Sequence, residues 1–412
     1  MEVKPGYKLT DVGVIPEDWE IKSFGELFEF RNGVNADKNA YGEGVRFINV
    51  LEPITYSHLH GQDIPGRVSL PERIINHYAV KKGDVIFNRT SETESEIGLA
   101  ATYLDSEVVV FGGFVIRGRP IFQALDPLYS GYAFRAPFIR SQIVPMGQGA
   151  VRANIGQQSL GKVLAPIPPY EDQRAIASVL SDMDALLDTL DRLIAKKCAI
   201  KQSAMQKILA GHIRLPGFSG EWEVKTLGDV VDHFVGGGTP SRANPAYWGN
   251  EIPWVTVKDF ATFNPFQAQE GITRLGLCNS ASNLIPAGTL ITSVRMTLGK
   301  AVVYQVDVAI NQDMKALFLN SDVTVDFLFH WFSCYGEHID DIGSGSTVKG
   351  ISVNELKRLE ISFPKKNEQT AIATVLTDMD AEIIALETRR AKTRALKQAM
   401  MQELLTGKTR LI

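Results

Sequence analysis

The chain has 412 residues, of which 44% are hydrophobic and 22% are charged, and its formal net charge is −4. This length predicts about two to three domains, and this composition excludes wholesale disorder. No apolar run approaches the roughly 18 residues of a membrane span, and the first residues lack the apolar stretch of a signal peptide. Three widely spaced cysteines, with no C-x-x-C pair, predict neither a disulfide framework nor a zinc finger. We therefore expect a cytoplasmic protein with no membrane partner.

Residues 1–165 are predicted to form a first mixed α/β domain. Short runs of β-branched and aromatic residues are typical of strands, and glycine-rich turns interrupt them, at 45–50, 84–87 and 107–111. The stretch 83–91 ends one of these strands and is predicted to expose four polar side chains, those of Asn88, Arg89, Thr90 and Ser91.

Residues 166–212 are predicted to form one long helix. Apolar residues recur at alternating steps of four and three from Ile176 to Ile194, prolines precede this pattern and Gly211 follows it. About 40 residues at 1.5 Å per residue give a rod of roughly 60 Å, far longer than a typical core helix. Lys197 and Lys201 interrupt this row of apolar residues, the apolar seam of the helix. Thr393 and Lys397 are the equivalent interruptions in the region 363–412. Polar residues in such seams usually fix the register of paired helices.

Residues 213–362 are predicted to form a second mixed α/β domain, with strands at 252–257 and 301–304. Its glycine-bounded loops carry the candidate binding side chains Thr239, Ser241, Arg242, Arg295, Lys300, Gln312 and Lys315. Arg, Asn and Gln are the side chains that suit bidentate recognition of guanine and adenine edges. A solvated loop position is the simpler interpretation of any single one. Their recurrence in both domains favours a nucleic-acid interface.

Residues 363–412 are predicted to form a second long helix that repeats the first. A shift of 196 residues places 172–185 on 368–381, and 22 of the 45 pairs from 171/367 to 215/411 are identical. Acidic residues gather in the first half of each helix and basic residues in the second, which partly reflects the helix dipole. Antiparallel packing also brings these opposite charges together. We therefore predict a pseudo-two-fold tandem repeat whose two long helices form an antiparallel intrachain coiled coil.

Two fragments imitate methyltransferase motifs. Ile167-Pro-Pro-Tyr170 resembles the signature of amino-methyltransferases, but that chemistry needs Asp, Asn or Ser at the first position to accept a hydrogen bond from the target amino group. Ile167 cannot accept one, and the prolines are accounted for by the start of the first long helix. Phe234-Val-Gly-Gly-Gly238 fits F-x-G-x-G, which is a weak pattern by itself.

Two further patterns imitate metal sites. Asp341, Glu355 and Lys357 loosely fit a metal-dependent nuclease spacing, for which a surface helix start is the better account. His330 shares a helical face with Cys334 and His338 and could bind zinc, but this helix is apolar and ordinary packing is favoured. We expect neither a catalytic nor a metal site in the chain.

The organisation resembles the DNA-specificity subunit of type I restriction–modification systems. The resemblance rests on the Pro-x-x-x-(Asp/Glu)-Gln starts of both long helices, their shared Ala-Ile-Ala-x-Val-Leu-x-Asp-Met-Asp sequence, and the Trp-Glu-x-Lys segments at 19–22 and 222–225. The loop 83–90 and the stretch 237–242, which precedes Ile-Pro-Trp-Val at 252–255, complete it. One departure is Asp172, where the family commonly has Glu.

The resemblance implies that 1–165 and 213–362 are target-recognition domains, each reading one half of a bipartite asymmetric DNA sequence. It implies that 166–212 and 363–412 are conserved spacer helices that set the spacing of the half-sites and dock methyltransferase subunits. The implied partners are double-stranded DNA, two DNA adenine methyltransferase subunits and ATP-dependent restriction subunits. AdoMet, ATP and Mg²⁺ would belong to those partners, with no cofactor in this chain.

Two alternatives stay open from the sequence. One is a self-contained DNA methyltransferase or nuclease, and the other is a coiled-coil scaffold unrelated to DNA. The net charge of −4 argues against an autonomous polyanion binder. It fits a recognition subunit if partner enzymes supply much of the phosphate contact.

Overall fold

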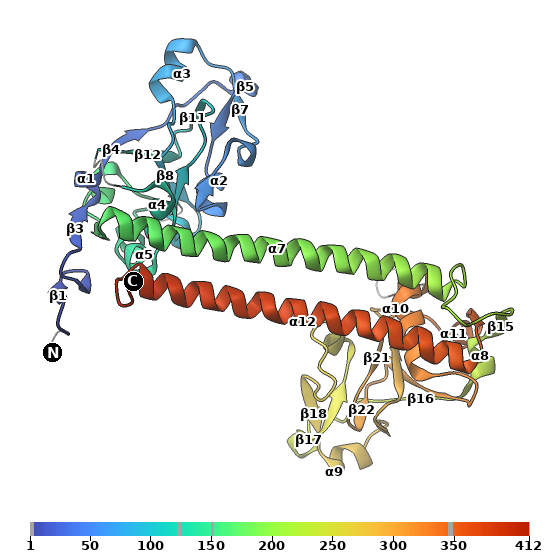
Figure 1. Cartoon of the computed structure of the whole chain (residues 1–412). Helices are drawn as coiled ribbons and strands as arrows, with labels where there is room; N and C mark the ends of the chain where they lie inside the picture. The colour runs from blue at the N-terminus through green and yellow to red at the C-terminus, as the bar shows by residue number, and fades with distance from the viewer. Residues whose placement is uncertain (1–3, 122–124, 150–151, 345–348, 412) are drawn as a thin grey trace. The chain divides into compact units, whose positions relative to one another are not determined.

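The computed structural model describes residues 4–121, 125–149, 152–344 and 349–411. The chain divides into two compact units, Met1–Leu190 with Arg389–Ile412, and Asp191–Thr388. Each unit contains one mixed α/β domain and a part of each of two long helices, α7 (Tyr170–Leu209) and α12 (Lys366–Leu404) (Figure 1). The predicted fold class is confirmed.

The two long helices have 40 and 39 residues, which corresponds to about 60 Å each. Both begin directly after proline-containing segments, and both are followed by a glycine with positive φ, 71° at Gly211 and 70° at Gly407. Residues with a Cβ seldom adopt this backbone conformation, so glycine allows the chain to leave the helix there. No helix in the described ranges is long and apolar enough to cross a membrane.

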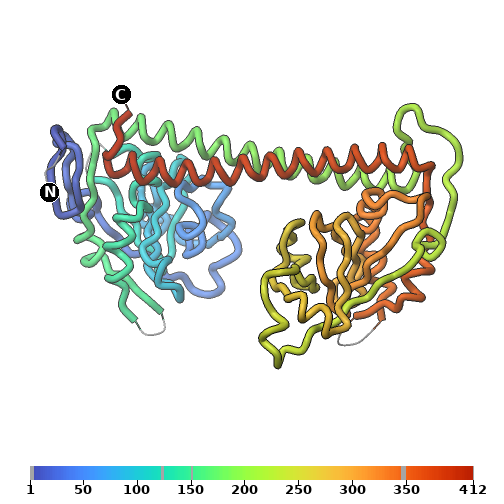
Figure 2. The backbone as a smooth tube through the Cα atoms, turned by 90° about the horizontal axis from the view of Figure 1, so that it is seen from below, coloured from blue at the N-terminus to red at the C-terminus, as the bar shows by residue number. Residues whose placement is uncertain are grey.

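In the first unit, the first half of α7 runs antiparallel to the last part of α12. Asp184 pairs with Lys397, and Asp172, nearer the start of α7, accepts a hydrogen bond of 2.7 Å from Arg410. Residue numbers therefore fall along one helix as they rise along the other. Figure 2 shows the green and red helices side by side.

The second unit repeats these contacts with the roles of the helices exchanged. Lys201 pairs with Asp380, and Arg214 donates two hydrogen bonds of 2.6 Å to the carboxylate of Glu368. A shift of 196 residues converts each of these pairs into its counterpart in the first unit. The predicted antiparallel coiled coil is confirmed, and the lysines that interrupt its seam each pair with an acid of the facing helix. Lys197 adds a further pair, with Glu382.

The first α/β domain is built on two main sheets. The larger has the strand order β4-β12-β8-β10-β6: Phe28–Asn32, Val115–Pro120, Val85–Asn88, Ala100–Tyr103 and His58–Leu59. The smaller has the order β11-β5-β7: Val109–Phe111, Tyr41–Ile48 and Arg67–Val68. Three short pairs complete the strands: β1 (Tyr7–Thr10) with β2 (Gly13–Pro16), β3 (Glu20–Ser23) with β14 (Leu164–Ile167), and β9 (Thr90–Ser91) with β13 (Ala153–Asn154).

Short helices join these strands. They are α1 (Phe24–Leu27), η1 (Lys38–Ala40), α2 (Leu51–Thr55), η2 (Gly61–Asp63), α3 (Glu72–Tyr78), η3 (Glu94–Glu96), α4 (Pro127–Ala133), α5 (Pro137–Ile143), η4 (Val144–Met146) and α6 (Gln157–Leu160). Among them, α1, α4, α5 and α6 contribute buried side chains to the core. Phe24 lies at the centre of the core, with its ring 5.1 to 5.7 Å from those of Phe28, Phe87 and Phe134. Ile176 and Leu180 of α7 extend this core, so the domain packs on the apolar seam of the helix.

The second α/β domain repeats the plan. One four-stranded sheet has the order β16-β23-β20-β21: Val231–Gly236, Met314–Leu319, Leu290–Ser293 and Ala301–Val303. The other has the order β18-β17-β22-β19: Glu270–Ile272, Trp248–Val255, Val308–Ile310 and Asn283–Ile285. β15 (Glu223–Thr226) pairs with β24 (Glu360–Phe363). The helices are α8 (Leu227–Val230), η5 (Pro245–Tyr247), η6 (Val257–Phe260), α9 (Arg274–Cys278), α10 (Val325–Ile342) and α11 (Val353–Lys357).

All five predicted strands are present, as β5, β8, β11, β17 and β21, with their ends shifted by a few residues. The parallel pairing of β5 with β11 in the first domain has a counterpart in the parallel pairing of β17 with β22 in the second. The duplication therefore extends to the α/β domains, although their sequences and loop lengths diverge. The three cysteines are free thiols.

A buried glutamine in the first turn of each long helix ties that helix to its α/β domain. Gln173 accepts a hydrogen bond from the backbone N–H of Asp126 at 2.9 Å and donates one to the carbonyl of Pro168 at 3.0 Å. Gln369 likewise accepts from the N–H of Thr324 at 3.0 Å and donates to the carbonyl of Pro364 at 2.9 Å. Asp126 and Thr324 are the N-cap residues of α4 and α10. These bonds give a physical reason for the Pro-x-x-x-(Asp/Glu)-Gln pattern.

Candidate nucleic-acid interface

The four candidate residues of the first domain lie at the end of β8 and in β9. Asn88 is fully buried, and its Nδ2 donates to the carbonyl of Glu96 at 3.0 Å. Ser91 is 7% exposed, and its hydroxyl donates to the Glu96 carboxylate at 2.6 Å. Both side chains therefore hold the loop after β8 in place. Arg89 and Thr90, which are half-buried, remain accessible beside them.

A second loop of the first domain lies beside Thr90. Its hydroxyl donates to Oδ1 of Asn154 at 2.6 Å, and β13, which contains Asn154, pairs with β9. Next to Asn154, the exposed Arg152 donates to Oε1 of Glu92 at 2.7 Å. Arg152 and Asn154 were not predicted as candidates, although Arg152 is a basic residue that follows the glycines Gly147 and Gly149. A direct DNA contact by any residue of this group stays a prediction.

In the second domain, the loops after β16 and β22 meet through two candidate residues. The hydroxyl of Thr239 donates to Oε1 of Gln312 at 2.7 Å, and both side chains are exposed. Lys315 lies opposite Gly236 in the pairing of β23 with β16. A Cβ on Gly236 would lie 2.5 Å from the Lys315 ammonium, so glycine leaves the space that this side chain crosses.

Arg295 and Gln312 line the same hollow, of about 650 Å³. The Arg295 side chain is 65% exposed and lies 3.8 Å from the carboxylate of Asp313, which is only 16% exposed. A largely buried acid thus orients an accessible guanidinium. Arg295 can offer a fork of N–H donors and Gln312 both a donor and an acceptor, which suits base edges and phosphates. Among the predicted residues, the structure brings together Thr239, Gln312 and Arg295.

Arg242 lies in a different environment, stacked on an aromatic ring. Its guanidinium carbon is 3.6 Å from the centroid of the Trp248 ring, and its two terminal nitrogens donate to the Glu270 carboxylate at 2.7 and 2.8 Å. These hydrogen bonds hold the pKa of Glu270 below its usual value. Ser241, which precedes Arg242, accepts a hydrogen bond from the Trp248 indole through its carbonyl.

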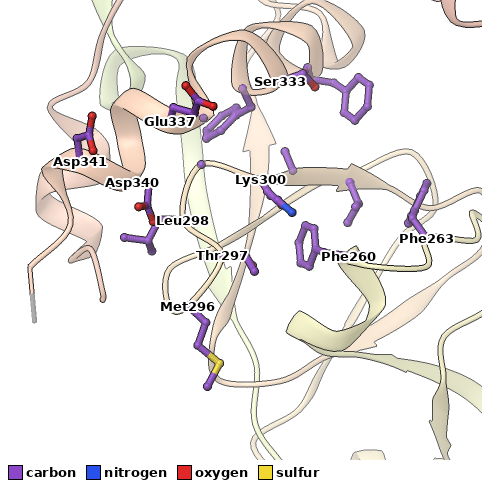
Figure 3. Close-up of a pocket in the computed structure, with 16 residues that line it drawn as sticks. Phe260, Phe263, Met296, Thr297, Leu298, Lys300, Ser333, Glu337, Asp340 and Asp341 are labelled. Atoms are coloured by element: carbon purple, nitrogen blue, oxygen red, sulfur yellow. The ribbon is translucent and has the colours of Figure 1, made fainter. Parts of the chain in front are cut away.

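Lys300 lines a second hollow of about 770 Å³ in the same domain, between the β20–β21 loop and α10 (Figure 3). Its walls include the rings of Phe260 and Phe263 and the carboxylates of Glu337 and Asp341. Lys300 is exposed and belongs to this hollow, whereas Arg295 and Gln312 line the other. The candidate residues of the second domain thus lie in several separate loops and do not form a single cluster.

The fragments that imitate methyltransferase motifs have structural roles. Ile167 is the last residue of β14 and is 3% exposed, and the carbonyl of Pro168 accepts the Gln173 hydrogen bond described above. Phe234 lies in β16, with the Lys357 ammonium 5.5 Å from the centroid of its ring.

Side chains of the fragments that imitate metal sites also make local structural contacts. Glu355 closes the capping box of α11 through a hydrogen bond of 2.8 Å from the backbone N–H of Ser352, and the hydrogen bonds from Ser352 lower the pKa of Glu355. His330 is 2% exposed, its Nε2 lies 3.1 Å from the hydroxyl of Thr377, and burial lowers its pKa. Within the described part of the chain, no group of three or more His, Cys, Asp or Glu side chains could hold a metal ion.

Comparisons with known proteins agree with this duplicated plan. The chain is 26% identical, over 98% of its length and 96% of the relative's, to a protein of Methanocaldococcus jannaschii assigned as the type I restriction enzyme MjaX specificity subunit. It is 29% identical to the Escherichia coli type I restriction enzyme EcoR124I/EcoR124II specificity subunit, over 52% of this chain and 55% of that one.

A solved structure has the same fold over almost its whole length. The type I restriction–modification S subunit from M. genitalium aligns with a TM-score of 0.58 at 14% identity, covering 98% of both chains. The model of one family, described as the type I restriction modification DNA specificity domain, matches twice, at residues 16–196 and 219–395. The chain therefore belongs to the family of type I restriction–modification DNA specificity domains.

Proposed function

We propose that the chain is the non-catalytic DNA-recognition subunit of a type I restriction–modification complex. The observation that carries this proposal is the duplication, within one chain of this family, of a domain and its long helix. The ion pairs and the glutamine contacts that fix each helix occur twice at a shift of 196 residues. The loops that carry the candidate polar side chains differ between the two domains. This is expected of two domains that share one fold and bind different DNA half-sites.

The duplication suits a bipartite DNA target. Two related readers in one chain match two half-sites on one duplex, as in dimeric DNA-binding proteins. Because the two readers are not identical, the target sequence is asymmetric. The antiparallel helices then set the spacing between the half-sites and offer two related surfaces for two copies of one partner.

The partners of this proposal are double-stranded DNA, two DNA adenine methyltransferase subunits and ATP-dependent restriction subunits. AdoMet, ATP and Mg²⁺ are bound by those subunits, and this chain binds no cofactor. The names of the relatives, which are type I restriction enzyme specificity subunits, support this assembly. A subunit with this function would work in the cytoplasm, beside the DNA. The net charge of −4 is consistent with partners that supply much of the phosphate contact.

Exchanging one recognition domain tests the proposal. Replacing residues 15–160 with the corresponding segment of another family member is expected to change one half of the methylated sequence and to leave the other half unchanged. The readout is genome-wide mapping of methylated adenines in cells that express the chain with its methyltransferase. The matched control replaces residues 220–360 and should change the opposite half.

Two outcomes would favour the alternatives. An unchanged methylation sequence after both exchanges would support a scaffold unrelated to DNA recognition. Labelled AdoMet retained by the purified chain would support a self-contained methyltransferase.

Substitution of Arg295 tests the hollow that it shares with Gln312. Arg295→Ala should weaken specific binding by about 1–3 kcal/mol and relax the preference at one position of one half-site, because a fork of donors to a base edge is lost. Competition binding of the assembled complex to target and random DNA measures both effects. Arg274→Ala, which removes the same charge from an exposed position on α9, is the control. If the two variants lose the same affinity for target and for random DNA, Arg295 contributes to binding only through its positive charge.

A further inference from the structure

Met296 has an unusual position in the loop between β20 and β21. Its φ angle is 66°, and it is the one non-glycine residue with positive φ among those that the structure describes. Residues with a Cβ are disfavoured in this conformation, and when one adopts it the surrounding structure must hold it there. The residue is nevertheless 57% exposed, so burial does not explain the conformation.

Main-chain hydrogen bonds to two other segments hold the loop. The N–H of Val294 donates to the carbonyl of Asp313 at 2.8 Å, and the N–H of Met296 donates to the carbonyl of Lys349 at 3.0 Å. In addition, the N–H of Ile351 donates to the carbonyl of Val294 at 3.0 Å. An apolar side chain is thus fixed at an exposed point on a stiff support.

Two exposed cationic side chains lie in the same loop as this apolar group. Arg295 precedes it and is 65% exposed, and Lys300, which is exposed, ends the same loop. The Lys349 ammonium is paired with the Asp340 carboxylate at 2.6 Å, and Glu337, Asp340 and Asp341 line the hollow that contains Lys300. Met296 lines both hollows of the domain, the one with Arg295 and Gln312 and the one with Lys300 (Figure 3). An exposed apolar side chain between two exposed cations of one loop suits stacked base pairs, which are apolar inside and carry phosphates outside.

We propose that Met296 is a wedge that inserts between two adjacent base pairs of the half-site read by the second domain. This inference rests on the function proposed above. Methionine is among the side chains that unstack base steps and kink the duplex in known complexes. Lys300 would bind a phosphate beside the step while Arg295 contacts a base edge, and the hydrogen-bonded loop would hold Met296 in place. Because pyrimidine–purine steps unstack most easily, the wedge would favour such a step without a hydrogen bond to any base.

Fluorescence of 2-aminopurine tests insertion directly. The probe replaces each adenine in turn within the target, which methylation mapping identifies, except the adenines that are methylated, because base flipping by the methyltransferase unstacks those by itself. The chain is used assembled with its methyltransferase subunits. Binding of the wild-type complex should raise the fluorescence at one step. Met296→Ala should abolish this rise and weaken specific binding about tenfold, the size typical of losing one base-pair contact. Met296→Leu should keep most of the signal, and Leu284→Ala, at a 45% exposed apolar position of the same domain, should change neither quantity.

A glycine variant separates this role from folding. Met296→Gly removes the Cβ that disfavours φ of 66°, so its melting temperature should be no lower than that of the wild type while the fluorescence rise is lost. If the wild-type complex binds its target specifically without unstacking any step other than those of the methylated adenines, the wedge is wrong and the proposed function stands. A loss of affinity on replacing thymine by uracil, without unstacking, would reassign Met296 to contact with a thymine methyl group. Failure of the wild-type complex to discriminate target from random DNA would overturn the proposed function itself.

Discussion

Gln369→Glu is expected to destabilise the second unit by about 3 kcal/mol or more, although the two side chains have the same shape. Gln369 is 1% exposed, and its Nε2 donates to the carbonyls of Pro364 and Asp322 at 2.9 and 3.0 Å. A carboxylate has no N–H to donate, so both carbonyls would lose a partner and would face a buried negative charge. Thermal or urea unfolding of the purified chain measures the loss.

The loss should depend on pH in a defined direction. Burial and the facing carbonyls would raise the pKa of the new carboxyl above its value in the unfolded chain, so the folded state would bind a proton more readily. The penalty is therefore greatest near neutral pH and shrinks as the pH falls through the raised pKa. Gln398→Glu, the same change at an exposed position of α12, is the control and should alter stability by less than about 0.5 kcal/mol. Equal losses at Gln369 and Gln398 would contradict the role assigned to the buried glutamine.

The framework of the fold was predictable because it repeats. The 196-residue shift identifies both long helices, and the acidic and basic halves of each helix favour antiparallel pairing before any contact is known. Lys201 and Lys397 mark the register because a lysine in an apolar seam requires an acidic partner, and Asp380 and Asp184 supply it. The spacing of apolar residues and the distribution of charge along a helix involve residues close in sequence, so they can be recognised from the sequence alone.

The candidate interface was less predictable because its geometry depends on distant segments. The end of β8 indicates exposed polar residues, yet the loop that includes Glu96 folds back and buries Asn88 and Ser91. Arg242 stands 28 positions from its partner Glu270, and no pattern in the sequence joins them. The conformation of Met296 likewise depends on carbonyls and N–H groups of two segments distant in sequence.

Lys201→Glu should destabilise the second unit by about 2 kcal/mol, and Asp380→Lys should have a similar effect. Each change places two like charges at the helix seam, where the Lys201 side chain is 20% exposed and that of Asp380 is 36% exposed. This partial exposure keeps the expected loss below that of breaking a fully buried pair. Chemical denaturation at low ionic strength is the measurement, and Lys196→Glu at an exposed position of α7 is the control for charge reversal.

The double variant, Lys201→Glu with Asp380→Lys, should recover most of the stability, because the attraction is restored with its direction reversed. Added salt should reduce both the single losses and the recovery, since it screens partly exposed charges. The equivalent exchange of Asp184 and Lys397 should give the same result in the first unit, because a shift of 196 residues relates the two pairs. Losses that simply add in the double variant would mean that the two residues do not interact. The register would then be set by the apolar residues of the seam, and the lysines would be tolerated interruptions rather than the groups that align the two helices.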